Sequence, residues 1–270
     1  MPQPESATEG ACPECEGRGW VIVADAGAGT ARPCDCRKRR LGTRLFAGAG
    51  IPERYDGCTL ESFRTGGFEG ASELAVSRLI EARGRSRRFV DDFLGEGGKP
   101  RPTGLLFIGP PGSGKTHLAV AVLSELIRRY GVRGRFVDFT SLIHQIQATF
   151  DPGSAESKAQ VLDPVIGAEL LVLDELGAQK PTPWVQDVLY LIINTRYTER
   201  RPTVFTTNYR LRLPQAASTA PDPGDEFTLL DRRISPQLVS RLYEMTVAVR
   251  LDGVEDFRRT VKTRERHLVG

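Results

Sequence analysis

Short apolar runs alternate with longer helix-like stretches in the last two thirds of the chain. The apolar runs predict strands at residues 105–108, 135–139, 170–173, 203–206 and 245–251. Helices are expected between them, at about residues 115–130, 140–150, 184–199 and 236–243. Strands and helices that alternate in this way are typical of a parallel sheet with helices on both faces. The pattern therefore predicts an α/β domain.

The preceding residues follow a different pattern. Apolar positions at helical spacing between residues 74 and 94 predict an amphipathic helix or a pair of helices. Its expected buried residues are Leu79, Ile80, Phe89, Val90, Phe93 and Leu94. The segment 95–102, rich in Gly and Pro, would end the helix in a short loop. Nearer the N-terminus, a strand is expected at residues 20–23, between two pairs of cysteines.

These patterns divide the chain into three expected parts. They are an N-terminal cysteine module with a basic run (1–48), a helical linker segment (49–103) and the α/β domain (104–270). Hydrophobic residues make up 40% of the 270 residues and charged residues 26%, which is ordinary for a globular protein. No apolar stretch approaches the roughly 20 residues of a membrane-spanning helix. The first residues do not resemble a secretory signal, so we expect a cytoplasmic protein without a membrane partner.

The basic residues are distributed unevenly, although the formal net charge is only +3. Between residues 32 and 54 seven residues are basic and two are acidic. The run Arg37-Lys38-Arg39-Arg40 follows the cysteines directly, and Arg83, Arg85, Arg87 and Arg88 form a second cluster. Residues 37–40 are either the solvated start of a helix or a patch that binds phosphate or a partner. The sequence leaves both interpretations open.

Four of the five cysteines have the spacing of a metal site. Cys12 and Cys15 form a C-x-x-C pair, and Cys34 and Cys36 form a C-x-C pair after 18 intervening residues. Two such pairs can place four thiolates tetrahedrally around Zn²⁺. The second pair departs from the commonest spacing, so unliganded or redox-active thiols are the alternative. Cys58 stands apart and is expected to be a small buried apolar residue.

The segment Gly109-Pro110-Pro111-Gly112-Ser113-Gly114-Lys115-Thr116 matches the phosphate-loop pattern G-x-x-x-x-G-K-[ST]. An apolar run precedes it and a helix-like stretch, beginning with His117, follows it. This is the strand–loop–helix context in which backbone N–H groups can point at phosphates. Lys115 would add a positive charge, and the Thr116 hydroxyl would ligate Mg²⁺. A glycine-rich turn without a ligand is the alternative, which this context disfavours.

The apolar run 170–173 ends in Asp174 and Glu175. In a buried parallel strand, both acids would lie at the carboxyl end, where phosphate-loop NTPases hold Mg²⁺. We assign Asp174 to the metal and Glu175 to the general base that polarises the attacking water. Solvated acids at the end of a strand are the alternative. Together with the phosphate loop, the two acids predict binding and hydrolysis of ATP.

From about residue 50 to residue 262 the chain resembles the AAA+ helicase loaders of the DnaC and DnaI type and the related IstB-type ATPases of insertion sequences. The segments that carry the resemblance are 50–63, 109–118, 136–142, 171–177, 201–208, 240–242 and 251–258. The first and last are specific to this subgroup, whereas the phosphate loop is generic. The resemblance implies an AAA+ P-loop NTPase with ATP and Mg²⁺ as cofactors, to which a small zinc-binding module is added.

The resemblance also implies roles for three polar residues. Asn208 fits the sensor-1 position, which orients the lytic water, although Thr-Thr-Asn is also common at a strand end or helix cap. Arg241 matches the arginine finger that reaches the ATP of a neighbouring subunit. Arg258 matches the sensor-2 position, which contacts the nucleotide of its own subunit. Surface or ion-paired roles are the alternatives for both arginines, and Arg232 and Arg233 are rival fingers.

Proteins similar to this chain use the AAA+ module to grip single-stranded DNA and an N-terminal module to hold the replicative helicase. They self-associate through ATP at subunit interfaces. DnaI-like members carry a cysteine-liganded zinc fold at the N-terminal end, which the four cysteines would suit. DNA contacts are expected from residues 141–150. Phe139, Phe150 and Tyr130 could stack on bases or pack in the core.

Three functions follow from these features. The first is an ATP-dependent loader that binds the replicative helicase and helps to place it on single-stranded DNA. The second is an IstB-type transposition ATPase that acts with a transposase on duplex DNA, and the third is an adaptor in which ATP only stabilises an assembly. The cysteine frame favours the first, because IstB-type proteins usually begin with a helical extension. Glu175 argues against the third, because a non-catalytic adaptor needs no general base.

Overall fold

The computed structural model describes residues 12–23, 30–68, 71–151, 153–211, 229–253 and 256–257. Its body contains a five-stranded sheet in the order β4-β5-β6-β3-β7, with every neighbouring pair parallel. The strands are β3 (Gly104–Ile108), β4 (Gly134–Asp138), β5 (Leu170–Asp174), β6 (Thr203–Thr207) and β7 (Thr246–Arg250). The predicted central parallel sheet is therefore confirmed.

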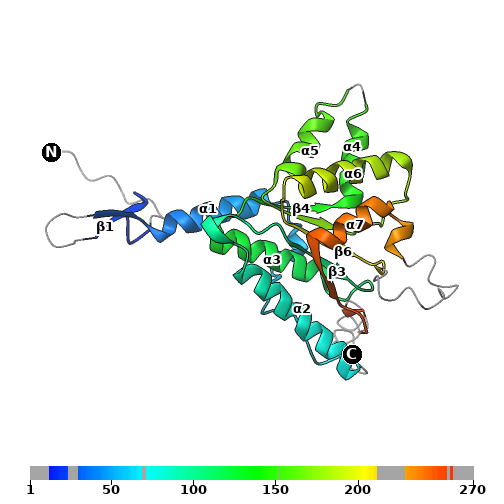
Figure 1. Ribbon diagram of the computed structural model, residues 1–270. Helices are drawn as coiled ribbons and strands as arrows, with labels where there is room; N and C mark the ends of the chain where they lie inside the picture. Colours follow the sequence, from blue (N-terminus) through cyan, green and yellow to red (C-terminus); the bar gives the residue numbers. More distant parts are fainter. Residues whose placement is uncertain are drawn as a thin grey trace, which may run out of the picture.

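Helices cover both faces of this sheet (Figure 1). One face carries α1 (Asp35–Gly48), α2 (Glu73–Asp91) and α3 (Lys115–Tyr130); the other carries α4 (Phe139–Ala148), α5 (Lys158–Gly167), α6 (Pro183–Thr198) and α7 (Pro236–Met245). Short 3₁₀ turns, η1 (Glu53–Tyr55), η2 (Glu96–Gly98) and η4 (Leu230–Arg232), lie in the connections. Among the described residues, no helix combines the length and the apolar character needed to cross a membrane.

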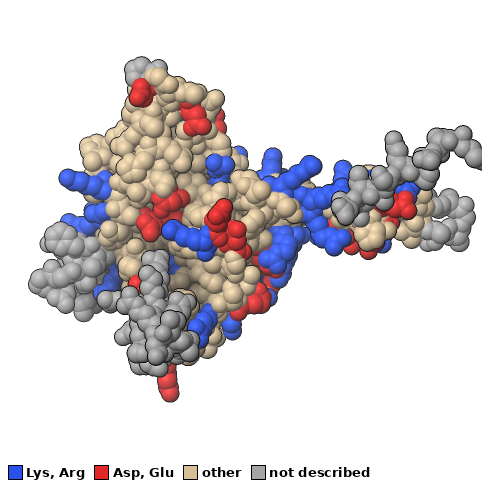
Figure 2. Space-filling model, turned by 180° about the vertical axis from the view of Figure 1, so that it is seen from behind, with Lys and Arg blue, Asp and Glu red and all other residues tan. Residues whose placement is uncertain are grey.

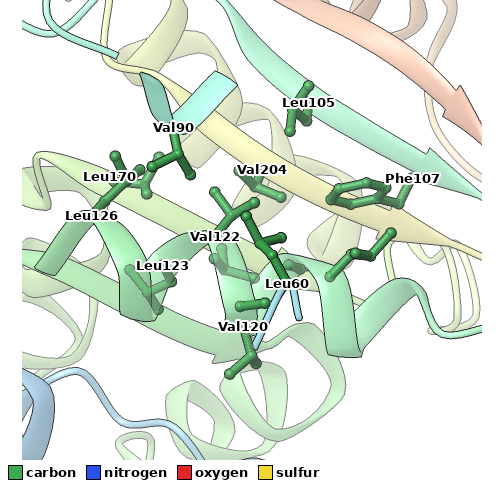
Figure 3. Close-up of a cluster of buried hydrophobic side chains, with 14 of the residues drawn as sticks. Leu60, Val90, Leu105, Phe107, Val120, Val122, Leu123, Leu126, Leu170 and Val204 are labelled. Carbon is green, nitrogen blue, oxygen red and sulfur yellow. The ribbon is translucent and has the colours of Figure 1, made fainter. Parts of the chain in front are cut away.

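Alternate side chains of each strand enter two separate cores. Leu105 and Phe107 of β3 point into the first, together with most of α3, whereas Leu106 and Ile108 point into the second. Figure 3 shows the first core, where Val120, Val122 and Leu123 of α3 lie beneath the strands. Because both faces of the sheet are covered, its strands are apolar along nearly their whole length. This explains why continuous apolar runs in the sequence located them.

Local signals at the helix ends agree with the fold. The side chains of Ser72, Asp138 and Thr182 accept hydrogen bonds from backbone N–H groups in the first turns of α2, α4 and α6. Ser157 and Gln160 form a reciprocal capping box at α5. Helix α5 was not expected from the sequence, because Pro164 lies inside it and proline disfavours helix interiors.

The predicted buried set of α2 needs one correction. Leu79, Val90 and Phe93 are buried, and Phe89 and Leu94 pack partly buried against the same core. Ile80 is instead 51% exposed, so its prediction was wrong. The buried stripe of α2 runs through positions 75, 79, 82, 86 and 90, and Ile80 lies one position beside it.

The N-terminal module lies away from the body at the end of α1 (Figure 1). Strands β1 (Trp20–Val23) and β2 (Thr30–Pro33) pair antiparallel, and Val21 packs against the four cysteines. The other end of α1 is fixed to the body, because Leu45 and Phe46 pack against the first core. The backbone N–H of Phe136 also donates to the Ala49 carbonyl at 2.7 Å.

A fully buried arginine, Arg196 of α6, connects the strand ends opposite the phosphate loop. Burial lowers its pKa to about 9. Its guanidinium donates to four backbone carbonyls and one hydroxyl, those of Val165, Ile166, Ala168, Pro202 and Thr203. These bonds join the end of α5 to the starts of β5 and β6, so the position of both strands depends on Arg196.

Candidate functional site

The phosphate loop connects β3 to α3, as the sequence predicted. Gly112 and Gly114 have φ values of 75° and 92°, a region that favours glycine. A Cβ atom on Gly114 would lie 2.6 Å from the Phe63 ring, and one on Gly109 would lie 2.5 Å from the Leu251 carbonyl oxygen. Close packing therefore excludes a side chain at Gly109, and close packing together with backbone conformation excludes one at Gly114.

A cavity of about 340 Å³ opens beside this loop. Residues 111–117 form one wall, and Glu175, Thr206 and Asn208 from the ends of β5 and β6 line it as well. The opposite wall comes from the segment 54–68 and from Phe257. The volume is within the range of small-ligand pockets. The fold thus brings together residues that are separated by up to about 200 positions in the sequence.

Asp174 lies at the floor of this site, next to the phosphate loop. Its carboxylate accepts a hydrogen bond from the Thr116 hydroxyl, which is 3.0 and 3.2 Å from the two oxygens. Burial raises the pKa of the Asp174 carboxyl, and hydrogen bonds from Thr206 and Thr116 oppose that shift. A hydroxyl and a carboxylate side by side are oxygen ligands of the kind that Mg²⁺ uses together with substrate phosphates. The two residues therefore fit the predicted metal site.

Glu175 leaves the strand with a φ of 59°, a left-handed conformation that is uncommon outside glycine. This turns its side chain from the sheet into the cavity, where it is exposed. Its backbone N–H donates to the Thr206 hydroxyl at 3.0 Å, and the next N–H, of Leu176, donates to the Thr206 carbonyl at 2.8 Å. The strained turn is held in place by β6.

Thr206 is a site residue that the sequence analysis did not assign. Its buried hydroxyl accepts from the Glu175 N–H and donates to the Asp174 carboxylate at 2.5 Å. One side chain therefore positions both acids. The role follows from sheet order, because β6 lies between β5 and β3 and its end faces Asp174 from the side of the phosphate loop. The segment Thr206-Thr207-Asn208 contains nothing in its residue types that indicates contact between Thr206 and the two acids.

The wall opposite the phosphate loop is attached through His117. The imidazole Nε2–H donates to the Thr59 carbonyl at 2.9 Å, and the Ser62 hydroxyl lies 3.2 Å from the same nitrogen. Burial lowers the pKa of His117, which favours the neutral ring. The Phe63 ring packs edge-on against it, with centroids 5.5 Å apart. His117 lines the cavity and also fixes the segment that closes it.

Two single-residue expectations, for Cys58 and for Arg258, concern this wall. Cys58 was expected to be a small buried apolar residue; it is only partly buried, because it packs against the first core on one side and lines the cavity on the other. Arg258 lies outside the described residues. Its neighbour Phe257 lies on the phosphate loop: its N–H donates to the Gly112 carbonyl at 3.3 Å, and its ring lies 6.4 Å from that of Phe68.

Arg241 lies on a different surface from the cavity. Its guanidinium sits over the rings of Tyr190 and Tyr197, 5.1 and 5.6 Å from their centroids, and donates to the Tyr190 hydroxyl at 3.3 Å. It is not among the described residues that line the cavity of its own chain. The rival Arg233 donates to the carbonyls of residues 177–179, directly after the acidic pair, and packs over Tyr209.

The three aromatic residues that could stack on bases differ in their surroundings. Phe139 is buried in the second core. Tyr130 stacks on Phe93, with centroids 6.4 Å apart. Phe150 is 59% exposed and packs edge-on against Trp184 at 5.7 Å. Of the three, Phe150 has the most accessible ring.

The four N-terminal cysteines converge as the spacing predicted. Their Sγ atoms all lie within 4.8 Å of one another, with Cys15 and Cys36 at 3.3 Å and Cys12 and Cys34 at 3.8 Å. Four sulfurs bound tetrahedrally to zinc at about 2.3 Å are about 3.8 Å apart, so the cluster has the dimensions to hold the ion. Zinc would cross-link the two ends of the module, in whose described residues Val21 is the side chain that packs against the four cysteines.

The thiols of the cluster differ from one another in pKa. Although burial alone would raise it, hydrogen bonds from Cys36 and from the Gly19 backbone N–H lower the pKa of Cys15 to about 7. The backbone N–H of Cys36 lowers the pKa of Cys34, but burial and the neighbouring thiols outweigh it and raise the pKa to about 12. Because zinc binds thiolates, its binding to the four sulfurs would release the protons that these thiols hold.

Comparison with known proteins agrees with this geometry. The model of the family described as IstB-like ATP binding protein matches residues 82–236. The replicative helicase loader DnaC of Escherichia coli (strain K12) is 29% identical over 165 residues, which cover 61% of this chain and 61% of that protein. A protein of insertion sequence IS5376 from Geobacillus stearothermophilus, named for ATP binding, is 35% identical over 108 residues, 40% of this chain and 41% of that protein.

Solved structures share the fold. A crystal structure of the DnaC helicase loader has a TM-score of 0.57 and 30% sequence identity, and the match covers 76% of this chain and 100% of that chain. The present chain spans about three fifths of the length of the curated DnaC relatives that it matches.

Proposed function

The chain belongs to the DnaC/IstB-like family of ATP-binding proteins, and we propose that it is an ATPase that binds the replicative DNA helicase and helps to place it on single-stranded DNA. One observation carries the proposal. A cavity lined by the phosphate loop, Glu175 and Asn208 lies in a body to which a separate four-cysteine module is joined through α1. The first part supplies an energy-driven cycle, and the second supplies a distinct surface for a partner.

In the proposed reaction, the backbone N–H groups of residues 112–116 and the Lys115 ammonium hold the β- and γ-phosphates. Thr116 and Asp174 would hold Mg²⁺, which when bound supplies positive charge against the phosphate oxygens. Glu175 accepts the proton of the attacking water, which Asn208 orients from the end of β6. The placement of Glu175 and Asn208 in one cavity with the loop supports these roles.

The aromatic side of the cavity suits the nucleotide base. Tyr55, Phe68 and Phe257 line it, and the Arg64 guanidinium lies 5.8 Å from the Phe257 ring. Flat apolar rings can pack against adenine, while the phosphates remain at the loop. Bound nucleotide would therefore touch both walls and hold the segment 54–68 against the body.

Arg241 would act on the ATP of a neighbouring subunit, so the active form is an assembly. Its position on the surface of α6 and α7, rather than in its own cavity, supports a role in trans. Arg233 is less suited, because its guanidinium already binds the carbonyls of residues 177–179. A guanidinium from a neighbouring subunit would add positive charge at the transition state to that of Lys115.

The N-terminal module, loaded with zinc on its four cysteines, would hold the helicase. Its hairpin exposes apolar side chains at the far end of α1: Ile22 is 76% exposed and Val23 is 40% exposed. Exposed apolar residues on a small module are typical of a protein-binding surface. The AAA+ body would contact single-stranded DNA through residues 141–150, where Phe150 is the exposed aromatic residue.

A second function is supported by one finding. The relative from an insertion sequence has the higher identity, 35%, over a shorter match, and this favours a transposition ATPase that acts with a transposase on duplex DNA. The two functions differ in partner and in DNA form, not in the chemistry of the nucleotide site.

Co-purification with the host replicative helicase, with and without ATP and single-stranded DNA, separates them. The loader should form a stable complex that the double variant Ile22→Ser, Val23→Ser loses. Leu74→Ser, at a position 60% exposed on α2, is the matched control and should keep the complex. Absence of a helicase complex, combined with ATP-dependent filaments on duplex DNA, would favour the transposition ATPase.

A further inference from the structure

Helix α1 joins the two parts of the molecule and is strongly basic. It carries Arg37, Lys38, Arg39, Arg40 and Arg44 against a single acid, Asp35. All five basic side chains are exposed, and within the described residues none of them lies in a salt bridge. Figure 2 shows Lys and Arg gathered where this helix connects the N-terminal module to the body. A helix that only connected two parts of the molecule would not need such an excess of positive charge.

Three of these arginines face the same way. With 3.6 residues per turn, Arg37, Arg40 and Arg44 lie on one side of α1, away from Leu45 and Phe46, which attach the helix to the body. They span about 10 Å along the axis at 1.5 Å per residue. The phosphates of one strand are spaced at 3.4 Å along the axis of a duplex and further apart in an extended single strand. The three charges therefore span at least two to three phosphates of an extended strand.

An exposed aromatic ring continues this surface. Trp20, at the start of β1, is 48% exposed, and the Arg37 guanidinium lies 4.9 Å from its ring centroid. Its neighbour Val21 faces the cysteine cluster, so the indole faces away from the cluster. A flat ring beside arginines that point outward is the arrangement on which unpaired bases stack while the backbone is neutralised.

We propose that the Arg37–Arg40–Arg44 face of α1, together with Trp20, binds a single nucleic-acid strand outside the AAA+ body. The arginines bind its phosphates, for which the planar guanidinium fork is suited, and the indole stacks on one base. The contact uses no residue of the ATP site, so it does not rest on the proposed ATPase. An acidic protein partner could bind the arginines alone, and the exposed indole of Trp20 would then have no role in the contact.

The test measures binding of a labelled oligothymidylate of about 20 nucleotides to the full-length, zinc-loaded protein without ATP, by fluorescence anisotropy at several salt concentrations. The variant is Arg37→Ala, Arg40→Ala, Arg44→Ala. The control, Arg88→Ala, Arg200→Ala, Arg250→Ala, removes the same charge from exposed sites on other elements. Alanine favours helix, so α1 should persist; circular dichroism and zinc content verify this.

The affinity of the variant at low salt should fall at least about tenfold. The slope of log K against log salt should also become less negative by roughly 2, because each of the three lost phosphate contacts accounts for about 0.7. The control should change little. The chain has two tryptophans, so in a Trp184→Phe protein all tryptophan fluorescence comes from Trp20. Its fluorescence should be quenched by the oligonucleotide and not by an abasic strand of the same length.

Three results would overturn the proposal. The first is an affinity and salt slope in the α1 variant equal to those of the control. The second is equal binding and equal Trp20 quenching with a duplex, whose bases are already stacked. The third is an α1 variant that no longer co-purifies with the helicase but binds the oligonucleotide as the parent protein does. That result would assign the basic face of α1 to a protein partner. Helicase binding that is retained while strand binding is lost would support it independently of the loader function.

Discussion

The replacement of Thr206 by valine tests whether one hydroxyl positions both acids of the nucleotide site. Valine keeps the shape of the side chain and its preference for strands, but it removes the donor to Asp174 and the acceptor for the Glu175 N–H. The neighbouring Thr207 provides a matched control. It is equally buried, and its hydroxyl makes two hydrogen bonds, to the Leu176 carbonyl and from the Tyr209 N–H, but it touches neither acid.

The expected size of the effect follows from these contacts. A hydrogen bond to a charged group contributes about 1.5–3 kcal/mol, and a buried N–H without its partner costs about 1–3 kcal/mol. Thr206→Val should therefore lose roughly 2.5–6 kcal/mol of unfolding free energy, and Thr207→Val, whose hydroxyl bonds only neutral groups, should lose less, about 1.5–4.5 kcal/mol. In Thr206→Val alone, Asp174 and Glu175 lose their fixed geometry. If the charged hydrogen bond is realised in the transition state, kcat falls about 10- to 100-fold.

Steady-state ATP hydrolysis and urea unfolding of both variants provide the assay. We predict that both variants have a lower urea midpoint than the parent protein, but that kcat is reduced in Thr206→Val only, with nucleotide affinity nearly unchanged. Equal kcat values in the two variants would refute a positioning role and leave Thr206 with a purely structural one.

Four further predictions concern separate parts of the molecule. Glu175→Gln should bind ATP with nearly normal affinity but hydrolyse it at least about 100-fold more slowly; normal turnover in a phosphate-release assay would exclude Glu175 as the base. Subunits with Arg241→Ala and subunits with Lys115→Ala should each be inactive alone and regain some hydrolysis when mixed, and failure at every mixing ratio would point to another finger. Arg196→Met should lower the free energy of unfolding, by about 1–3 kcal/mol for each buried carbonyl that is left without its donor; a urea midpoint like that of the parent protein would contradict this. Cys12→Ser should reduce the zinc measured by atomic emission, whereas equal zinc content would show that the cluster does not hold the ion.

The features that the sequence predicted well are local or repeat with a simple period. The strands of the sheet are buried on both faces, so their apolar runs were visible without knowledge of their neighbours. The phosphate loop is one continuous segment between two of these elements. The four cysteines could be paired by spacing, and their Sγ atoms indeed converge.

The features that were missed depend on contacts between distant segments. Thr206 acquires its role because sheet order places β6 between Asp174 and the phosphate loop. Cys58 lines the cavity because His117 binds the Thr59 carbonyl and holds the segment 54–68 across the site. Ile80 was misplaced by one position around a helix, and α5 was hidden by Pro164. None of these follows from residue type or period alone.

The most direct measurement of the central claim is the amount of replicative helicase that becomes bound to a closed circle of single-stranded DNA. A circle has no end over which a helicase ring could thread, so loading has to be assisted. We predict that the protein with ATP increases the amount of helicase on the circle, and that the Lys115→Ala variant does not. No increase with the active protein, under conditions in which it hydrolyses ATP, would contradict the loader function.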